Sequence, residues 1–390
     1  MPLKINKYHT ILIGIFGLMF ATGFISLEIK DSIVSVKKML VLSMFAFTFF
    51  LGKRVNKKVF EIWGVFAMYI LYSLVLMVVK KINLFDYFTV FLAFFYAFCL
   101  FFFAGKKVIK QEFFDKFFSG LLIMFSIKYL ITILTTPYRP ILFIENNFEL
   151  LFMAILLIGS IRFSEKINYL HVVLSGFIAI SSTSRSGAAI FIFLLGILFF
   201  KWEYIKLKYW WVFSLILVGV GLAVMQFINR IPEGGIEQID RFRFLVVFFS
   251  EIKNWGLWEY LFGNPIITPL SIENCGKLSY YQSLFSFSGT GDCYSVVLHS
   301  FILRVILDHG FLGLILLFFG VYKMFKVSGF PNRYIWAIIG VLFLNSISIS
   351  SINSIFAVFA MGLIMIVKPR EKLSPIRINE VEKIVIDGVQ

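Results

Sequence analysis

Long apolar blocks, separated by short polar or basic segments, run through most of the chain. Blocks such as residues 210–228 and 311–322 are almost free of charge. Blocks of about 20 residues match the hydrocarbon thickness of a bilayer, where a helix satisfies its own backbone groups. The pattern predicts an all-α polytopic membrane protein with about twelve transmembrane helices. We expect them at residues 9–27, 39–52, 59–79, 86–104, 112–134, 149–161, 169–184, 186–200, 209–228, 299–322, 334–348 and 351–367.

Basic residues gather after every second predicted span. Lys53 and Arg54 follow the second span, and Lys106 and Lys107 follow the fourth. Lys and Arg accumulate in short loops that stay in the cytoplasm. The alternation therefore predicts an even number of spans with both termini in the cytoplasm.

The segment 229–298 is the only extramembrane stretch long enough to fold, and it falls on the outer face. It is rich in Gly and Pro, and its apolar run 242–252 has basic residues near its edges, which predicts a short helix at the membrane interface. The chain then divides into spans one to nine (1–228), a large outer loop (229–298), spans ten to twelve (299–367) and a cytoplasmic tail (368–390).

The composition supports a membrane protein. Of 390 residues, 59% are hydrophobic and 15% charged, whereas a soluble domain has about 45–50% apolar and about 25% charged residues. The net charge of +15 would favour a nucleic-acid partner in a soluble protein, but cytoplasmic loop charges explain most of it, so we expect none. We find no metal-ligand spacing, no P-loop or dinucleotide glycine pattern and no nucleophile elbow, and therefore predict no metal and no cofactor.

Arg185 lies between two apolar runs, in a segment of hydroxyl residues that includes Ser184 and Ser186. A charge at membrane depth is costly and often functional. A guanidinium among hydroxyls suits a phosphate or diphosphate. The alternative is a tight turn whose arginine reaches the lipid headgroups.

Arg230, Arg241 and Arg243 belong to the outer loop. Arginines beside aromatic residues at an interface are commonly headgroup anchors. They are also candidates for binding an anionic substrate, since a guanidinium grips phosphate oxygens in bidentate fashion.

Lys128 and Arg139 bracket the outer end of the fifth predicted span, with Glu145 and Glu149 nearby. Intramembrane charges either pair with one another or line a polar cavity. The four residues are therefore expected to pair or to line a groove for an anionic lipid.

His299 begins the tenth predicted span, where the outer loop returns to the membrane. Histidine is suited to proton transfer near neutral pH, although a lone histidine at a helix start is often structural. His309, deeper in the span, is expected to be a buried polar partner, with Asp308 as the candidate.

Cys275 and Cys293 both lie in the outer loop. In an oxidising compartment such a pair forms a disulfide when the geometry allows it. The alternatives are a bridge, which we favour, and two free thiols.

Three segments together resemble a known family. The hydroxyl-rich segment around Arg185 precedes Arg241, which is followed after three residues by Leu245. His299 is followed by Ser300, nine residues, Gly310, two residues and Gly313. This arrangement resembles the O-antigen ligase and O-antigen polymerase superfamily of bacterial envelope glycosyltransferases. The resemblance covers residues 150–367, and the first half of the chain matches only in topology.

The resemblance implies a twelve-span protein of the bacterial inner membrane with one large periplasmic loop. Such enzymes transfer a glycan from an undecaprenyl diphosphate-linked oligosaccharide to a hydroxyl acceptor at the periplasmic face, without a metal. Arg185 and Arg241 would then stabilise the diphosphate, with Arg243, Ser184, Ser186, Arg230, Arg139 and Lys128 as further substrate contacts, and His299 would act on the acceptor hydroxyl.

The acceptor distinguishes polymerase from ligase. A polymerase uses the terminal sugar of another lipid-linked repeat unit, and a ligase uses lipid A-core. The His299 pattern is best described for ligases, whereas richness in Phe, Ile and Lys is typical of polymerase genes, so we expect a polymerase. A chain-length regulator is then an expected partner. A flippase for lipid-linked sugars is a third candidate, but one large loop suits chemistry at one face better than alternating access.

Overall fold

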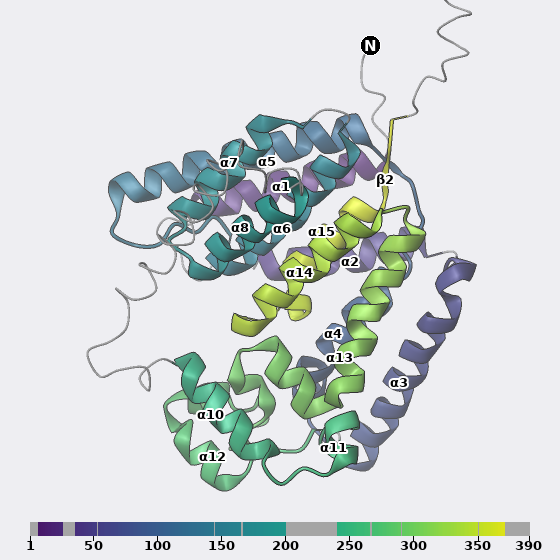
Figure 1. The fold of residues 1–390 in the computed structure, drawn as a ribbon, viewed down its shortest axis with the longest axis vertical. Coiled ribbons are helices and arrows are strands. Elements are labelled where there is room, and N and C mark those ends of the chain that lie inside the picture. The colour runs from purple at the N-terminus through teal and green to yellow at the C-terminus, as the bar shows by residue number, and fades with distance from the viewer. Residues whose placement is uncertain are drawn as a thin grey trace, which may run out of the picture.

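The computed structural model describes residues 7–25, 36–52, 54–143, 145–164, 167–199, 240–265, 267–289, 291–349 and 351–370, and nearly all its regular structure is helical (Figure 1). The α-helices are α1 (Lys7–Ile25), α2 (Val36–Leu51), α3 (Phe60–Val79), α4 (Leu84–Leu100), α5 (Gln111–Thr135), α6 (Asn146–Phe163), α7 (Tyr169–Ser181), α8 (Arg185–Phe199), α10 (Asp240–Ile252), α11 (Leu257–Phe262), α12 (Ile272–Lys277), α13 (Phe301–Val327), α14 (Asn332–Ser348) and α15 (Ile355–Met365). Short 3-10 turns are η1 (Lys57–Val59), η5 (Ser279–Leu284), η6 (Ser295–Leu298) and η7 (Ser351–Asn353).

Eleven of the predicted spans coincide with α-helices, and the ninth, residues 209–228, lies outside the described residues. Within the described ranges, four helices are long and apolar enough to cross a membrane: Lys57–Val79, Gln111–Thr135, Asn146–Phe163 and Phe301–Val327. Several others are apolar but shorter. The described part of the chain thus has the helices of a membrane protein.

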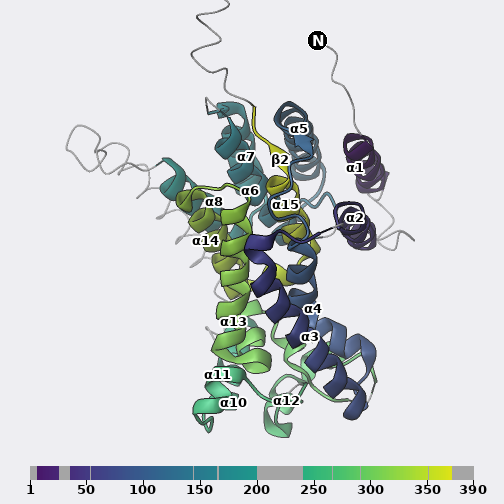
Figure 2. The ribbon, with the colours of Figure 1, turned by 90° about the vertical axis from the view of Figure 1, so that its right-hand side faces the viewer.

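The centre of the bundle is α15 packed against α6. Every residue of α15 is buried, and α6 is buried along most of its length. Helices α2 and α4 also contact α15, while α8 and α14 cover α6 (Figure 2). A helix that is apolar on all sides is stable only in such surroundings or in lipid. Helix α3 is the opposite case: apolar side chains such as Met68 and Leu71 are exposed along it.

Helix α13 is interrupted at Gly310, and the backbone at the end of α11 and just after it packs against the backbone of α13 at this point. Gly310 has φ 65° and ψ −174°, and a Cβ there would lie 2.3 Å from the carbonyl oxygen of Leu261. A Cβ on Gly263, φ 79°, would lie 2.6 Å from the amide nitrogen of His309. The Asn264 amide donates to the Leu307 carbonyl at 2.8 Å. Two residues without side chains therefore allow this close backbone contact.

One end of the molecule, called the sheet end here, joins distant parts of the chain. Strand β1 (Ile109–Lys110) pairs in parallel with β2 (Val367–Lys368). Lys107 Nζ donates to the carbonyls of Ser328 at 2.9 Å and Met365 at 3.0 Å, near the ends of α13 and α15. These contacts satisfy carbonyls that a helix leaves without partners. Burial lowers the pKa of Lys107 to about 8, so the ammonium is still mostly protonated at pH 7.

The opposite end, called the loop end here, is formed by α10, α11 and α12 (Figure 1). Here α13 begins beside a polar break between α14 and α15. The Ser351 hydroxyl donates to the Leu342 carbonyl at 2.7 Å, and the Ser300 hydroxyl donates to the Ser346 carbonyl at 3.1 Å. The break interrupts an otherwise apolar stretch without leaving these backbone carbonyls unsatisfied, and it forms one wall of the site described below.

We expect the substitution Gly310→Ala to lower the unfolding free energy by roughly 2 kcal/mol or more, because the new methyl group meets backbone atoms at a positive φ. The control is Gly329→Ala: Gly329 also has a positive φ, 82°, but a Cβ there meets nothing within 4 Å. Thermal unfolding in detergent compares the two variants. Equal unfolding temperatures would show that the Gly310 contact is not tight.

Candidate functional site

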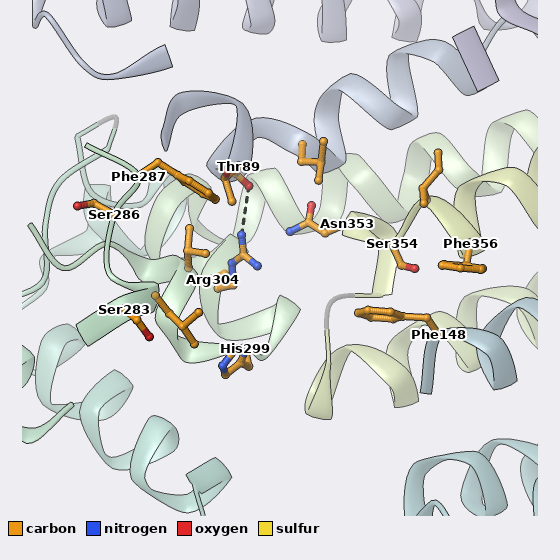
Figure 3. Close-up of a pocket in the computed structure, with 14 residues that line it drawn as sticks. Thr89, Phe148, Ser283, Ser286, Phe287, His299, Arg304, Asn353, Ser354 and Phe356 are labelled. Atoms are coloured by element: carbon orange, nitrogen blue, oxygen red, sulfur yellow. Dashed lines mark hydrogen bonds between the residues drawn. The ribbon is translucent and has the colours of Figure 1, made fainter. Parts of the chain in front are cut away.

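A cavity of about 310 Å³ lies at the loop end, between the start of α13, the η7–α15 break, α4 and the chain after η5 (Figure 3). We call it the Arg304 cavity. The residues that line it are Thr89, Leu92, Phe148, Ser283, Leu284, Ser286, Phe287, Val296, His299, Arg304, Asn353, Ser354, Ile355 and Phe356. Polar groups from α13 and η7 thus share the cavity with an apolar wall.

The polar centre of this cavity is Arg304, one turn into α13 and only 6% exposed. Its Nη2 donates to the backbone carbonyl of Thr89 at 3.2 Å (Figure 3), and Asp308, one turn further along, faces it electrostatically. Within the described ranges, Arg304 Nε has no hydrogen-bond partner. The residues that the structure describes therefore satisfy this buried guanidinium only in part.

Two other polar atoms of the cavity are also buried without a hydrogen-bond partner in the described part of the chain. Asn353 Oδ1 and Ser354 Oγ are buried and have no hydrogen-bond partner among the residues that the structure describes. A buried polar group without a partner costs about 1–3 kcal/mol, and each such group calls for an explanation. Three of them around one cavity indicate a site prepared for a polar ligand or for ordered water.

His299 lies on the same cavity, between η6 and α13, with a left-handed backbone (φ 54°). Its ring contacts Phe244 and Tyr281 with centroid distances of 5.5 and 6.4 Å. The side chain is solvent-exposed. Partial desolvation by the surrounding protein, and after it the positive charge of Arg304, lower the pKa of His299 from its usual 6.5, whereas the negative charge of Asp240 raises it. The imidazole is therefore neutral at pH 7 and competent to accept a proton.

Helix α10 brings further charge to His299. Asp240 acts on His299, as described, and its neighbour Arg241 is close enough to Arg139 for the two charges to interact. Partial burial and Arg139 lower the pKa of Arg241, while Asp240 and Glu145 raise it. The structure thus places Arg241 within electrostatic reach of Arg139, and Asp240 within electrostatic reach of His299. Arg243 of the same helix faces Tyr281 instead.

The hydroxyl-rich segment forms the turn between α7 and α8. Ser184 Oγ and Ser186 Oγ donate to Asn147 Oδ1 at 2.7 and 3.2 Å, and the Gly187 amide donates to Ser184 Oγ at 3.1 Å. Both hydroxyls hold the turn on the start of α6, and their expected role as substrate contacts stays a prediction. Arg185 is the first residue of α8.

Lys128 has a charged neighbour inside the bundle, and its role as a substrate contact stays a prediction. It is buried on α5 within electrostatic reach of Glu149, a carboxylate that accepts from the Tyr129 hydroxyl at 3.2 Å and from the Phe143 amide at 2.5 Å. Burial of one charge requires the other. The pair therefore stabilises the connection between α5 and α6, as one of the two sequence alternatives held, and does not line the Arg304 cavity.

Two predicted pairs are resolved differently. Cys275 and Cys293 are free thiols, with Cys275 Sγ 4.0 Å from the Cys293 carbonyl, and burial raises the pKa of both. No bridge joins them in this structure, and the disulfide favoured from the sequence stays a prediction for an oxidising compartment. His309 is buried as expected, but its Nδ1 pairs with the Tyr69 hydroxyl at 2.7 Å, whereas Asp308 accepts from Ser295. Arg230 lies outside the described residues.

Sequence reasoning missed Arg304, Asn353 and Ser354. The criterion that selected Arg185, a lone charge within an apolar block, also applies to Arg304, five residues after His299. Asn353 and Ser354 are polar residues at the start of the last predicted span, 351–367. What only the structure reveals is that these two segments meet.

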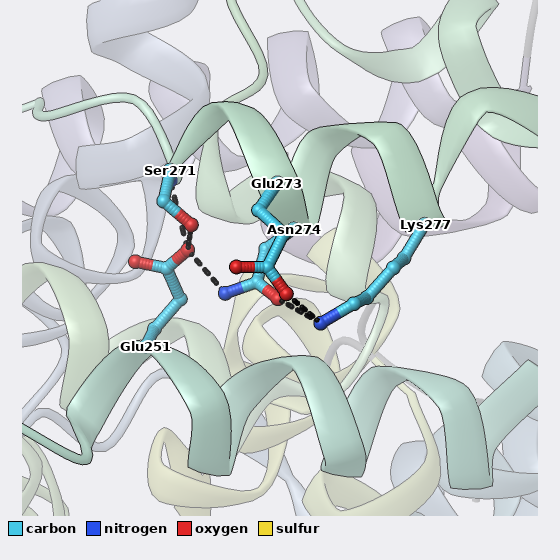
Figure 4. A network of polar contacts seen from close by, with 5 residues as sticks. All are labelled: Glu251, Ser271, Glu273, Asn274 and Lys277. Atoms are coloured by element: carbon cyan, nitrogen blue, oxygen red, sulfur yellow. Dashed lines mark hydrogen bonds and ion pairs between the residues drawn. The ribbon is translucent and has the colours of Figure 1, made fainter.

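Glu251 fixes the position of α10, which carries Arg241. Its Oε1 accepts from the Ser271 amide at 2.8 Å, the Ser271 hydroxyl at 2.6 Å and Asn274 Nδ2 at 2.8 Å (Figure 4). One carboxylate thus holds the start of α12 against the end of α10. The nearby pair of Lys277 and Glu273, 2.7 Å apart, is solvent-exposed.

We expect Glu251→Ala to loosen the loop end, since it removes three charge-assisted hydrogen bonds at once. Amide hydrogen exchange in α12 should become at least about tenfold faster. Glu273→Ala removes only the exposed pair and should leave exchange unchanged. Mass spectrometry of peptides from α10–α12 compares the variants, and equal exchange in both would contradict the role of Glu251.

Comparison of the chain with protein-family models, with curated proteins and with solved structures returns no match.

Proposed function

We propose that this chain is an O-antigen-type polymerase. It would transfer a glycan from an undecaprenyl diphosphate carrier to the terminal sugar hydroxyl of another lipid-linked repeat unit. The observation that carries the proposal is the Arg304 cavity, where a buried guanidinium and a neutral His299 line the same space. One group suits a diphosphate, and the other suits an acceptor hydroxyl.

The leaving group requires positive charge. When the bond between the sugar C1 and the diphosphate oxygen breaks, both electrons of that bond leave with the diphosphate. Arg304 is held by Thr89 and leaves Nε without a partner among the described residues, so it is oriented before the substrate arrives. Fixed cations of this kind stabilise charge that develops in the transition state. Arg241 on α10 and Arg139 between α5 and α6, which lie within electrostatic reach of each other, are further cations for the same anionic substrate in this proposal.

The acceptor requires a base. As the acceptor oxygen forms its bond to C1, its proton passes to His299, whose lowered pKa leaves the ring neutral at pH 7. Desolvation is the main cause of that lowering and the charge of Arg304 adds to it, so the cation that binds the diphosphate also favours the unprotonated base. This coupling gives the two residues complementary roles in one step.

The apolar wall of the cavity suits the carrier lipid. Phe148 and Phe356 stack with centroids 6.4 Å apart and an interplanar angle of 13°, and Leu92 and Ile355 extend the surface. A ligand with a charged head and a hydrocarbon tail matches this combination of a cationic centre and an apolar wall.

The proposal includes an orientation. Lys107, Arg162, Lys326 and Arg333 belong to the sheet end, where their contacts involve helix-terminal carbonyls and a polar side chain. By the positive-inside tendency this end faces the cytoplasm, with both termini, and the loop end faces the periplasm. The full protein would then have twelve spans in the bacterial inner membrane. A ligase would use the same donor chemistry and differ in the acceptor.

Arg304→Gln should reduce polymerisation by about a hundredfold or more, because it removes a fixed cation from the leaving group. The assay is chain extension by the purified protein from purified lipid-linked repeat units. Arg370→Gln is the matched control, since Arg370 pairs with Glu112 on the surface at 2.7 Å. Long chains made by Arg304→Gln at the normal rate would refute the assigned role. Transfer to lipid A-core, with no extension of lipid-linked units, would identify a ligase.

The rate should rise with pH through the pKa of His299, which lies below 6.5, and level off near neutrality. The base must be unprotonated to act, and its neutral fraction grows as pH passes upward through its pKa. His299→Gln should lower the rate and remove this acid limb, while Arg370→Gln keeps it. Initial rates between about pH 5 and 8 test this. An unchanged acid limb in His299→Gln would exclude His299 as the base.

A further inference from the structure

A second cavity, of about 640 Å³, lies on α13 at the Gly310 break, bounded by α3 and by α11 with the chain that follows it. We call it the α11 cavity. Its lining residues are Tyr69, Tyr72, Leu76, Lys80, Trp258, Glu259, Phe262, Gly263, Asn264, Pro265, Asp308, His309, Leu312, Gly313 and Leu316. The Arg304 cavity shares none of these residues.

The two cavities differ in chemistry. The Arg304 cavity has an arginine and no carboxylate in its lining, whereas the α11 cavity has two carboxylates, Glu259 and Asp308, against one ammonium. An anionic headgroup is therefore better accommodated in the first cavity. The α11 cavity favours a ligand that is neutral and rich in hydroxyl groups, since carboxylates accept hydrogen bonds and the side-chain amide of Asn264 can both donate and accept them.

Aromatic faces complete the second cavity. Trp258 is 70% exposed and Tyr72 is 58% exposed, and Trp258 stacks on Phe262 with centroids 5.9 Å apart. Flat apolar rings beside hydrogen-bonding groups match a sugar, which has apolar C–H faces and polar edges. The platform is rigid, because the chain after α11 is docked into α13 through Gly263 and Gly310.

Helix α13 connects the two cavities. Arg304 and Asp308 lie one turn apart, interact electrostatically, and line the first and the second cavity respectively. Asp308 also accepts from Ser295 in η6, four residues before His299. The two cavities are therefore held in a defined relation across a single helix.

We propose that the α11 cavity is a carbohydrate-binding subsite, which holds the glycan of the acceptor strand while the donor diphosphate occupies the Arg304 cavity. The proposal rests on the proposed function, because only an enzyme that joins two glycans requires a second glycan subsite. Trp258 supplies the stacking face, and Asn264 with Glu259 supplies hydrogen bonds to sugar hydroxyls.

The experiment measures binding of two probes to the purified full-length protein by calorimetry. The first probe is the repeat-unit oligosaccharide released by mild acid from the lipid-linked units of the same cells, and the second is undecaprenyl diphosphate. Trp258→Ala and Asn264→Ala should each weaken oligosaccharide binding by about tenfold or more, and both should bind undecaprenyl diphosphate as the unaltered protein does. Tyr280→Ala is the matched control, since Tyr280 is 85% exposed and lines neither cavity.

The reciprocal variant separates the two proposals. Arg304→Gln should lose affinity for undecaprenyl diphosphate and keep affinity for the oligosaccharide. Unchanged oligosaccharide affinity in both Trp258→Ala and Asn264→Ala, or no oligosaccharide binding by the unaltered protein, would overturn the carbohydrate subsite alone. Undecaprenyl diphosphate affinity that does not depend on Arg304 would instead count against the proposed function.

Discussion

The buried guanidinium of Arg304 is the constraint on which the loop end depends. A charge inside an apolar helix bundle is stable only with partners, and removal of one partner of a buried pair typically costs about 3–5 kcal/mol. The Thr89 carbonyl and the charge of Asp308 meet part of this requirement. Asp308 in turn takes a hydrogen bond from Ser295, which ties η6 to α13. Partial desolvation and, after it, the charge of Arg304 lower the pKa of His299, so the requirements of folding and of the proposed chemistry meet at one residue.

Close backbone contact between α13 and the chain after α11 also holds the loop end together. Gly263 and Gly310 let the chain after α11 dock into an interruption of α13, and Asn264 donates to the Leu307 carbonyl left exposed there. An interrupted helix at membrane depth is tolerated where protein covers the freed backbone groups. The interruption thereby shapes one cavity and, through the first turns of α13, positions the other.

The helices themselves were largely predictable from sequence. Apolar blocks of bilayer length required little tertiary information, because the backbone in lipid must form its own hydrogen bonds. The site was predictable only in part. His299, Arg241 and Arg139 were singled out by residue type, and the structure places His299 on the Arg304 cavity and Arg241 within electrostatic reach of Arg139. Ser184, Ser186 and Lys128 have polar partners in the protein. A sequence shows which polar residues are unusual, but not which of them already have partners.

The sequence by itself determined that the chain is an apolar helical membrane protein with a few costly polar groups, because hydropathy and charge depend on composition along the chain. Tertiary structure alone decided how those groups are used. Arg304 and Asn353 are 49 positions apart, and they line one cavity only because the start of α13 packs beside the break before α15. Trp258 of α11 and Tyr72 of α3 likewise line one cavity. Such proximity follows from helix packing, which side-chain shape and backbone contact determine over long separations in sequence.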